Sequence, residues 1–104
     1  MASGNIQNQL RNRVRSGTKV GSIVTSNASY NIVYDGYISG TASSRPGDGR
    51  VAQVGINGIA VCGVGSNAST NVTVQVFAFV YAGDVVNTRS LGGGEAYNID
   101  VYKF

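Results

Sequence analysis

The residues that could perform acid–base or metal chemistry are few in this sequence. It contains five acidic side chains, one cysteine and no histidine. The commonest general base and the commonest metal ligand are therefore missing. The single thiol, Cys62, excludes an intrachain disulfide and a cysteine-based zinc site. These totals disfavour an enzyme, and we expect no catalytic residues, no metal and no cofactor.

The acidic residues also occupy positions that indicate turns. Asp35, Asp48 and Asp84 each border a glycine, where an aspartate commonly accepts hydrogen bonds from the backbone of its own turn. A glycosidase would need two carboxylates facing each other across a cleft, one of them made more basic by burial. With so few acids, a small glycan-cleaving enzyme is the remotest function that fits the chain.

Positive charge is concentrated near the N-terminus. The first nineteen residues carry +4 and no acid, while the whole chain carries +3, so the remainder carries −1. A basic segment of this kind suits docking onto an acidic surface, or it is a solvated helix end. Aromatic residues do not interleave with the basic ones, which disfavours nucleic acid as a partner.

Residues 1–17 form an N-terminal arm, for which a helix and an extended segment both remain open. Ile6, Leu10 and Val14 recur every four residues, which would form one narrow apolar stripe on a helix. Gly4 and the nearby asparagines are weak helix formers. In either conformation we expect the arm to anchor the protein to a larger particle, through Ile6, Leu10, Arg11, Arg13, Val14 and Arg15.

The chain shows no signal for the membrane or for export. No apolar run approaches the length of a transmembrane helix. The N-terminus also lacks the apolar core of a signal peptide. We therefore expect no membrane insertion, and synthesis in a cytoplasm.

Residues 18–104 read as one β-domain. Short apolar runs separated by turn residues predict strands over 20–25, 30–34, 37–42, 50–56, 59–64, 71–82, 85–89 and 95–104. Asn57-Gly58 fits a two-residue hairpin turn, and Asp35-Gly36 is a second tight-turn signal. About eight short antiparallel strands with regular turns indicate an all-β fold, a jelly-roll-like β-sandwich.

The longest β-like run, residues 71–84, is apolar on both faces in its second half. One face carries valines and an alanine, and the other begins with Thr73 and Gln75 before it turns aromatic. A strand that is apolar on both faces must be covered on both sides. Unless the N-terminal arm folds back over it, no other segment of the chain is large enough to cover the aromatic side, so we expect a subunit interface formed by Phe77, Phe79 and Tyr81.

Ligand contacts are expected in the loops between the strands, because loops carry most binding residues. The clearest loops are residues 43–49, 65–70 and 91–94, which are rich in glycine and small polar residues. In and beside the loops, the candidate contact residues are Arg45, Asp48, Arg50, Asn67, Arg89 and Leu91.

Four short motifs follow one another along the β-domain. They are YDGYISG at residues 34–40, INGIAV at 56–61, VYAGDVV at 80–86 and YNIDVYKF at 97–104. In this order they resemble the jelly-roll head domains of bacteriophage tail fibres and related virion-surface proteins. Those domains are similar in architecture to trimeric tumour-necrosis-factor-like domains.

The resemblance implies a non-enzymatic bacteriophage virion protein that is a homotrimer with aromatic residues near its threefold axis. It would be assembled in the host cytoplasm and bind a receptor, either a glycan or an envelope protein, for host attachment. The N-terminal arm would bind other virion proteins. A capsid decoration protein, docked on the particle through the same arm, is the alternative.

Overall fold

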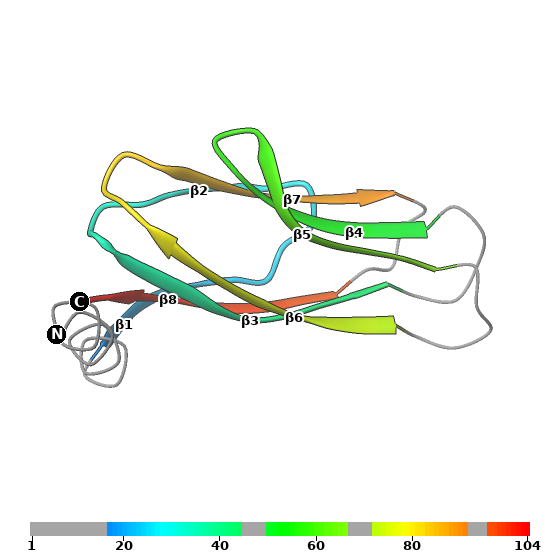
Figure 1. The fold of residues 1–104 in the computed structure, drawn as a ribbon, viewed down its shortest axis with the longest axis horizontal. Helices are drawn as coiled ribbons and strands as arrows, with labels where there is room; N and C mark the ends of the chain where they lie inside the picture. Colours follow the sequence, from blue (N-terminus) through cyan, green and yellow to red (C-terminus); the bar gives the residue numbers. More distant parts are fainter. Residues whose placement is uncertain (1–16, 45–49, 67–71, 92–95) are drawn as a thin grey trace, which may run out of the picture.

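The computed structural model is a sandwich of two four-stranded antiparallel sheets (Figure 1). It describes residues 17–44, 50–66, 72–91 and 96–104. Sheet A has the strand order β1 (Thr18–Ile23), β8 (Ala96–Lys103), β3 (Gly36–Ser44) and β6 (Val72–Val80). Sheet B has the order β2 (Ser29–Asn31), β7 (Val85–Leu91), β4 (Arg50–Ile56) and β5 (Ile59–Ser66).

The strand pairs are nested. The hairpin β4–β5 is the innermost pair, and β3–β6, β2–β7 and β1–β8 follow outward along the chain. Each pair is antiparallel, and successive pairs alternate between the two sheets. This nesting is the arrangement of a jelly roll. The predicted fold class, an all-β jelly-roll-like sandwich of eight strands, is confirmed.

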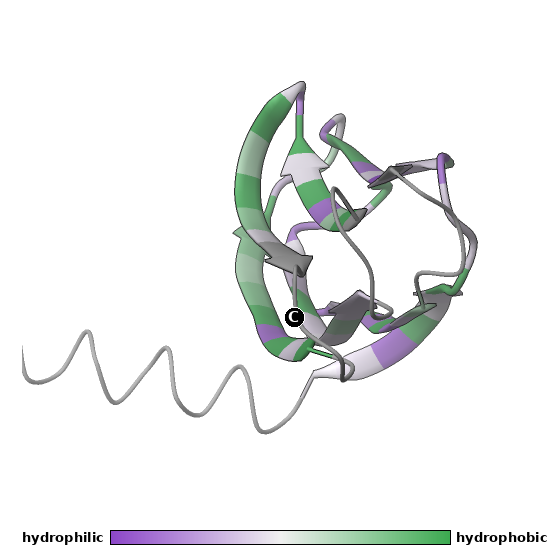
Figure 2. Ribbon diagram, turned by 90° about the vertical axis from the view of Figure 1, so that its right-hand side faces the viewer, coloured by the Kyte–Doolittle hydropathy of each residue, from purple (hydrophilic) through white to green (hydrophobic). Residues whose placement is uncertain are grey.

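The core lies between the sheets and is built from alternate residues of each strand, as the period of two requires. Hydrophobic and hydrophilic bands alternate along the ribbons in Figure 2. Burying each large aliphatic side chain stabilises the fold by about 2 kcal/mol. The valine face of β6 points into this core. The largest fully buried aliphatic side chains are Ile38, Val54, Val76, Val80, Val86 and Ile99.

Thr88 fastens the loop after β1 to sheet B. Its buried hydroxyl donates to the carbonyl of Thr25 at 2.6 Å and accepts from the Ala28 N–H at 3.2 Å. The Thr88 N–H also donates to the Ala28 carbonyl at 3.0 Å. These three bonds satisfy buried polar groups at the place where the chain crosses from one sheet to the other.

The connection between β2 and β3 differs from the sequence prediction. The predicted strand over residues 30–34 ends at Asn31, and the bend at Asp35 leads from sheet B to sheet A. The bend is tied to distant segments: the Asp35 carboxylate accepts from the Ala82 N–H at 2.9 Å, and its carbonyl accepts from the Phe104 N–H at 3.1 Å. These long-range bonds favour a crossover over a local hairpin.

Candidate functional site

Aromatic side chains gather on the outer face of sheet A. The strand register places Tyr102 of β8 beside Tyr37 of β3, and Tyr37 beside Phe79 of β6. Lys19 of β1 is paired with Tyr102, so this row runs across all four strands. Side chains in one row on one face lie close enough to contact each other.

The rings form one continuous cluster around Tyr37. Its ring stacks on Tyr102 with centroids 4.8 Å apart and on Phe77 at 5.6 Å. Phe79 meets Phe77 edge to face at 5.4 Å, and Phe104 lies 6.1 Å from both Tyr37 and Phe79. These are favourable geometries for aromatic pairs. We call the five residues Tyr37, Phe77, Phe79, Tyr102 and Phe104 the aromatic patch.

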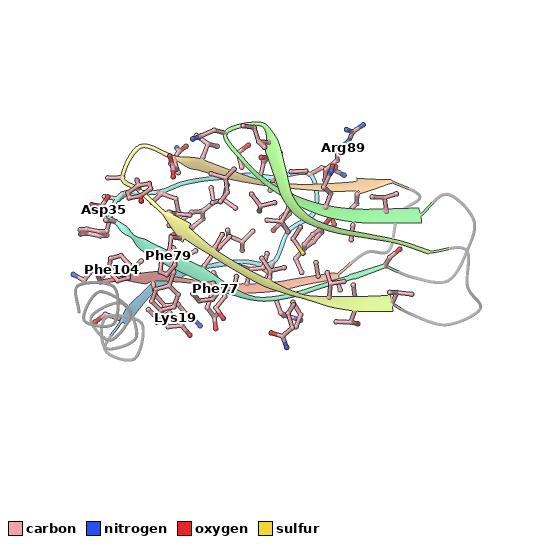
Figure 3. The ribbon with its side chains drawn as sticks, in the orientation of Figure 1. Lys19, Asp35, Phe77, Phe79, Arg89 and Phe104 are labelled. Carbon is pink, nitrogen blue, oxygen red and sulfur yellow. The ribbon has the colours of Figure 1, made fainter. Side chains whose placement is uncertain are left out.

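The outer rings of the patch are exposed, while its central ring is not. Phe77 is 52% exposed, Phe79 43% and Phe104 40%, whereas Tyr37 is 5% exposed. Figure 3 shows the three phenylalanines together at the end of sheet A where the C-terminus lies, and alternation with the buried Val76 and Val80 puts Phe77 and Phe79 on the face away from sheet B. Burial raises the pKa of Tyr37, and the neighbouring Tyr102 raises it further. Exposed apolar clusters are where interaction surfaces are sought, so the aromatic patch is the candidate functional site.

The other end of the same face is polar. Beyond the row of Asp100, Ser39 and Phe77, the next row on this face contains Asn98, Thr41 and Gln75, and Ser43 and Thr73 follow. The hydroxyls of Ser43 and Thr73 lie 2.8 Å apart across the strands. The change from polar to aromatic along β6 is therefore repeated in β3 and β8, and the outer face of sheet A is divided into two halves.

The structure places two of the three residues predicted for the subunit interface in the aromatic patch. Phe77 and Phe79 lie in the patch, but β6 ends at Val80 and Tyr81 falls in the following turn. Tyr81 is 65% exposed, and no ring contact joins it to the other described aromatic residues. The sequence missed the grouping with Tyr37, Tyr102 and Phe104, although Tyr102 and Phe104 share one face of the last strand. Contact with a second copy stays a prediction.

The predicted ligand contacts are only partly in loops. Arg50 is the first residue of β4, and Leu91 is the last residue of β7. Arg89 lies within β7. Arg89 lies in a strand, as predicted, but β7 continues to Leu91, which was predicted to lie in a loop, because β7 pairs with β4 as far as Leu91. The remaining candidates lie outside the described residues; these are Arg45, Asp48 and Asn67, together with Ile6, Leu10, Arg11, Arg13, Val14 and Arg15 of the arm.

The three described acids all have structural partners. Asp35 accepts from Ala82, and Asp100 forms an ion pair with Lys19 at 3.1 Å. The backbone N–H of Tyr81, followed by the side chain of Asn57, lowers the pKa of Asp84. In the described part of the chain, no three acidic, cysteine or histidine side chains gather in a way that could hold a metal ion, and no helix could cross a membrane.

Cys62 lies on β5 and is half-buried against the core. Its thiol points toward sheet A, where the sulfur is 3.4 Å from the carbonyl oxygen of Gln75. Packing therefore explains the presence of Cys62, because its small thiol fills space between the edges of the two sheets.

Comparison with known proteins identifies the fold. No protein-family model matches the chain, and no curated protein sequence matches it. Among solved structures, the crystal structure of GITRL from bushbaby, a ligand of the tumour-necrosis-factor family, superposes with a TM-score of 0.56. The sequences are 18% identical, and the match covers 78% of this chain and 77% of that chain. This likeness shows a tumour-necrosis-factor-like jelly roll.

Proposed function

We propose that this protein is a non-enzymatic attachment module that assembles as a homotrimer through the aromatic patch. The single observation that carries the proposal is the patch itself, whose three phenylalanines are each at least 40% exposed on one sheet face. Aromatic side chains bury about 150–250 Å² each when they are covered, and they dominate the energetics of interfaces. A cluster of them left in water is costly unless a partner covers it.

A second copy of the chain is the partner that fits the patch best. The patch contains no charged residue, and its rim carries the Lys19–Asp100 ion pair, so each copy offers both signs of charge. A standard interface buries about 800 Å² per partner. Five rings supply the apolar centre of such an area, and the polar rows beyond them supply a rim. The fold and the sequence resemblance both favour three copies.

The position of Gly17, the residue that follows the arm in the chain, also supports this assembly. Gly17, the first described residue, lies against Tyr37: a Cβ built on Gly17 would be 2.5 Å from the Tyr37 hydroxyl oxygen. Residues 1–16 therefore join the domain at the aromatic patch. In a trimer built on the patch, three basic arms would start close together, which suits attachment to one point on a particle.

The test of the assembly is the molar mass of the purified protein by light scattering. We expect a folded trimer for the unaltered chain and a folded monomer for Phe77→Lys, because a lysine cannot be buried among the rings. Gln75→Lys is the matched control, since it adds the same charge to the same face of β6 two residues away. A monomeric unaltered chain, or a trimeric Phe77→Lys variant, would refute the proposal.

The finer part of the proposal is a role in host attachment on the bacteriophage virion. It is supported by the four motifs that resemble tail-fibre head domains. Labelled electron microscopy of particles would locate the protein. Label at tail tips supports host attachment, whereas a lattice of label over the capsid would replace it with the decoration role.

A further inference from the structure

The outer face of sheet B contains a polar hollow on the opposite side of the molecule from the aromatic patch. Its volume is about 230 Å³, and it is lined by Gln53, Gly55, Gly58, Ala60, Asn87 and Arg89. We call these six residues the polar hollow. Figure 3 shows Arg89 reaching outward from sheet B, away from the phenylalanines of the patch.

The strand register explains why this face is hollow. Arg89 of β7 is paired with Gln53 of β4, and Asn87 is paired with Gly55 in the next row of the same face. Gly55 is paired in turn with Ala60 of β5. The floor of the hollow, formed by Gly55 and Ala60, therefore carries at most a methyl group. The longer polar side chains line one side of the hollow. A Cβ on Gly55 would be 2.9 Å from the Asn87 Oδ1 atom, so an alanine there would crowd the floor.

Hydrogen bonds from a buried core side chain hold the backbone beneath the hollow. The buried hydroxyl of Tyr97 donates to the Arg89 carbonyl at 2.7 Å and accepts from the Gln53 N–H at 3.2 Å. The same oxygen lies 2.9 Å from the Ser90 hydroxyl. One side chain of sheet A thus fixes the two strands from which Gln53 and Arg89 project. A binding site built on rigid strands is already organised before its ligand arrives.

The electrostatics of sheet B favour an anion. Its four strands contain two arginines, Arg50 and Arg89, and no acid. Arg89 is exposed and forms no ion pair with any described residue. The side-chain amides of Gln53 and Asn87 likewise make no hydrogen bond within the described part of the chain. The hollow therefore presents one guanidinium and two amides whose hydrogen-bonding groups are available to a ligand.

We propose that the polar hollow binds the carboxylate of an acidic sugar, such as a uronic acid, as the unit of a surface glycan. A guanidinium binds a carboxylate through two parallel hydrogen bonds. Each side-chain amide offers two donors and an acceptor, which suits the neighbouring ring hydroxyls. The hollow is smaller than the pockets of drug-sized ligands, which measure about 300–1,000 Å³, so it suits a single ring.

A carboxylate fits the hollow better than a phosphate. One guanidinium and two neutral amides match a single negative charge, whereas the doubly charged phosphate commonly meets several cations. The inference rests on the proposed attachment role in one respect: that role supplies the source of the ligand, a surface glycan. Its binding chemistry does not depend on trimerisation, so the monomeric Phe77→Lys variant should bind the sugar as well as the unaltered chain.

The test is a nuclear magnetic resonance titration of the isotope-labelled protein with methyl β-glucuronide at up to about 10 mM, the range of weak single-sugar sites. We expect saturable shifts of the backbone amides in β4 and β7 around the hollow. Methyl β-glucoside, which lacks the carboxylate, acetate, which lacks the ring, and inorganic phosphate should each bind at least about tenfold more weakly.

Three variants assign the binding to the hollow. Arg89→Gln should abolish the shifts, and Arg89→Lys should weaken binding about tenfold because lysine lacks the planar fork. Lys103→Gln, which removes the same charge from sheet A, is the matched control and should bind normally. The proposal is overturned if the glucuronide leaves the amides unshifted, if glucoside or phosphate binds as tightly, or if folded Arg89→Gln retains the affinity. Failure here with an intact trimer would leave the assembly proposal standing.

Discussion

The side-chain amide of Asn57 donates to a carboxylate oxygen of Asp84 across 2.9 Å and joins two turns that are distant in sequence. Asn57 also accepts from the Val85 N–H at 2.9 Å and donates its own N–H to the Val85 carbonyl at 2.8 Å. The second Asp84 oxygen accepts from the Tyr81 N–H at 2.9 Å. The β4–β5 hairpin turn is thereby fixed to the turn that precedes β7.

The first prediction concerns this junction. Asn57 has a φ of 53°, in the left-handed region that glycine and asparagine tolerate. Asn57→Gly keeps the turn conformation and removes the side-chain bonds, so we expect a loss of about 1 kcal/mol in unfolding free energy. Asn57→Ala adds backbone strain and should lose more than Asn57→Gly. Urea denaturation measures both, and equal losses would show that the turn conformation is not strained in alanine.

The second prediction concerns acid. The pKa of Asp84 is lowered in the folded state, first by the Tyr81 N–H and then by Asn57. A lowered folded pKa contributes stability that is present above the unfolded value and is lost as the pH falls through the folded value. The stability difference between the unaltered chain and Asp84→Asn should therefore shrink as the pH falls below about 4. A difference that stays constant from neutral pH to pH about 2 would contradict this assignment.

The third prediction concerns the buried hydroxyl of Tyr97. Tyr97→Phe leaves the Gln53 N–H and the Arg89 carbonyl without their partner, so the unfolding free energy should fall by about 1–3 kcal/mol. Tyr102→Phe is the matched control, because its hydroxyl makes one contact of 3.4 Å with Asp100. The control should lose less than about 1 kcal/mol. Equal denaturation midpoints for the two variants would show that the Tyr97 bonds contribute little.

The fourth prediction concerns Gly40 in the middle of sheet A. A Cβ on Gly40 would collide with the backbone carbonyl oxygen of Asn98 on the paired strand β8. Gly40→Ala should therefore destabilise the domain by about 1–3 kcal/mol or more through forced backbone movement. Gly63→Ala on β5 is the control, since the nearest atom to its Cβ would be the Ala52 carbonyl oxygen at 3.5 Å. Thermal melting compares the two, and a Gly40→Ala protein with the melting temperature of Gly63→Ala would contradict the steric argument.

Several features could be predicted from the sequence because their causes are local. Alternation along the last strand puts Tyr97, Ile99 and Val101 on one face, and all three are buried. Asn57-Gly58 marked the hairpin turn, and the hairpin β4–β5 forms there.

Two strands end at other residues than the sequence predicts, because long-range contacts decide where they end. β7 continues to Leu91, beyond the predicted end at residue 89, because it pairs with β4, whose residues lie almost forty positions earlier in the chain. Tyr81 continues the aromatic alternation of Phe77 and Phe79, but it lies in the turn after β6, where its N–H donates to the Asp84 carboxylate. A pattern with period two does not show where a strand stops.

The sequence by itself determined the strands, the apolar face of each and the composition of the chain. The tertiary structure decided which side chains became neighbours, since the rows across a sheet join strands that are far apart in sequence. Tyr37 and Phe77 are forty positions apart, yet their rings stack, and Gln53 and Arg89 flank one hollow for the same reason. Both surfaces arise from pairing between β-strands, which side-chain alternation within a single strand does not specify.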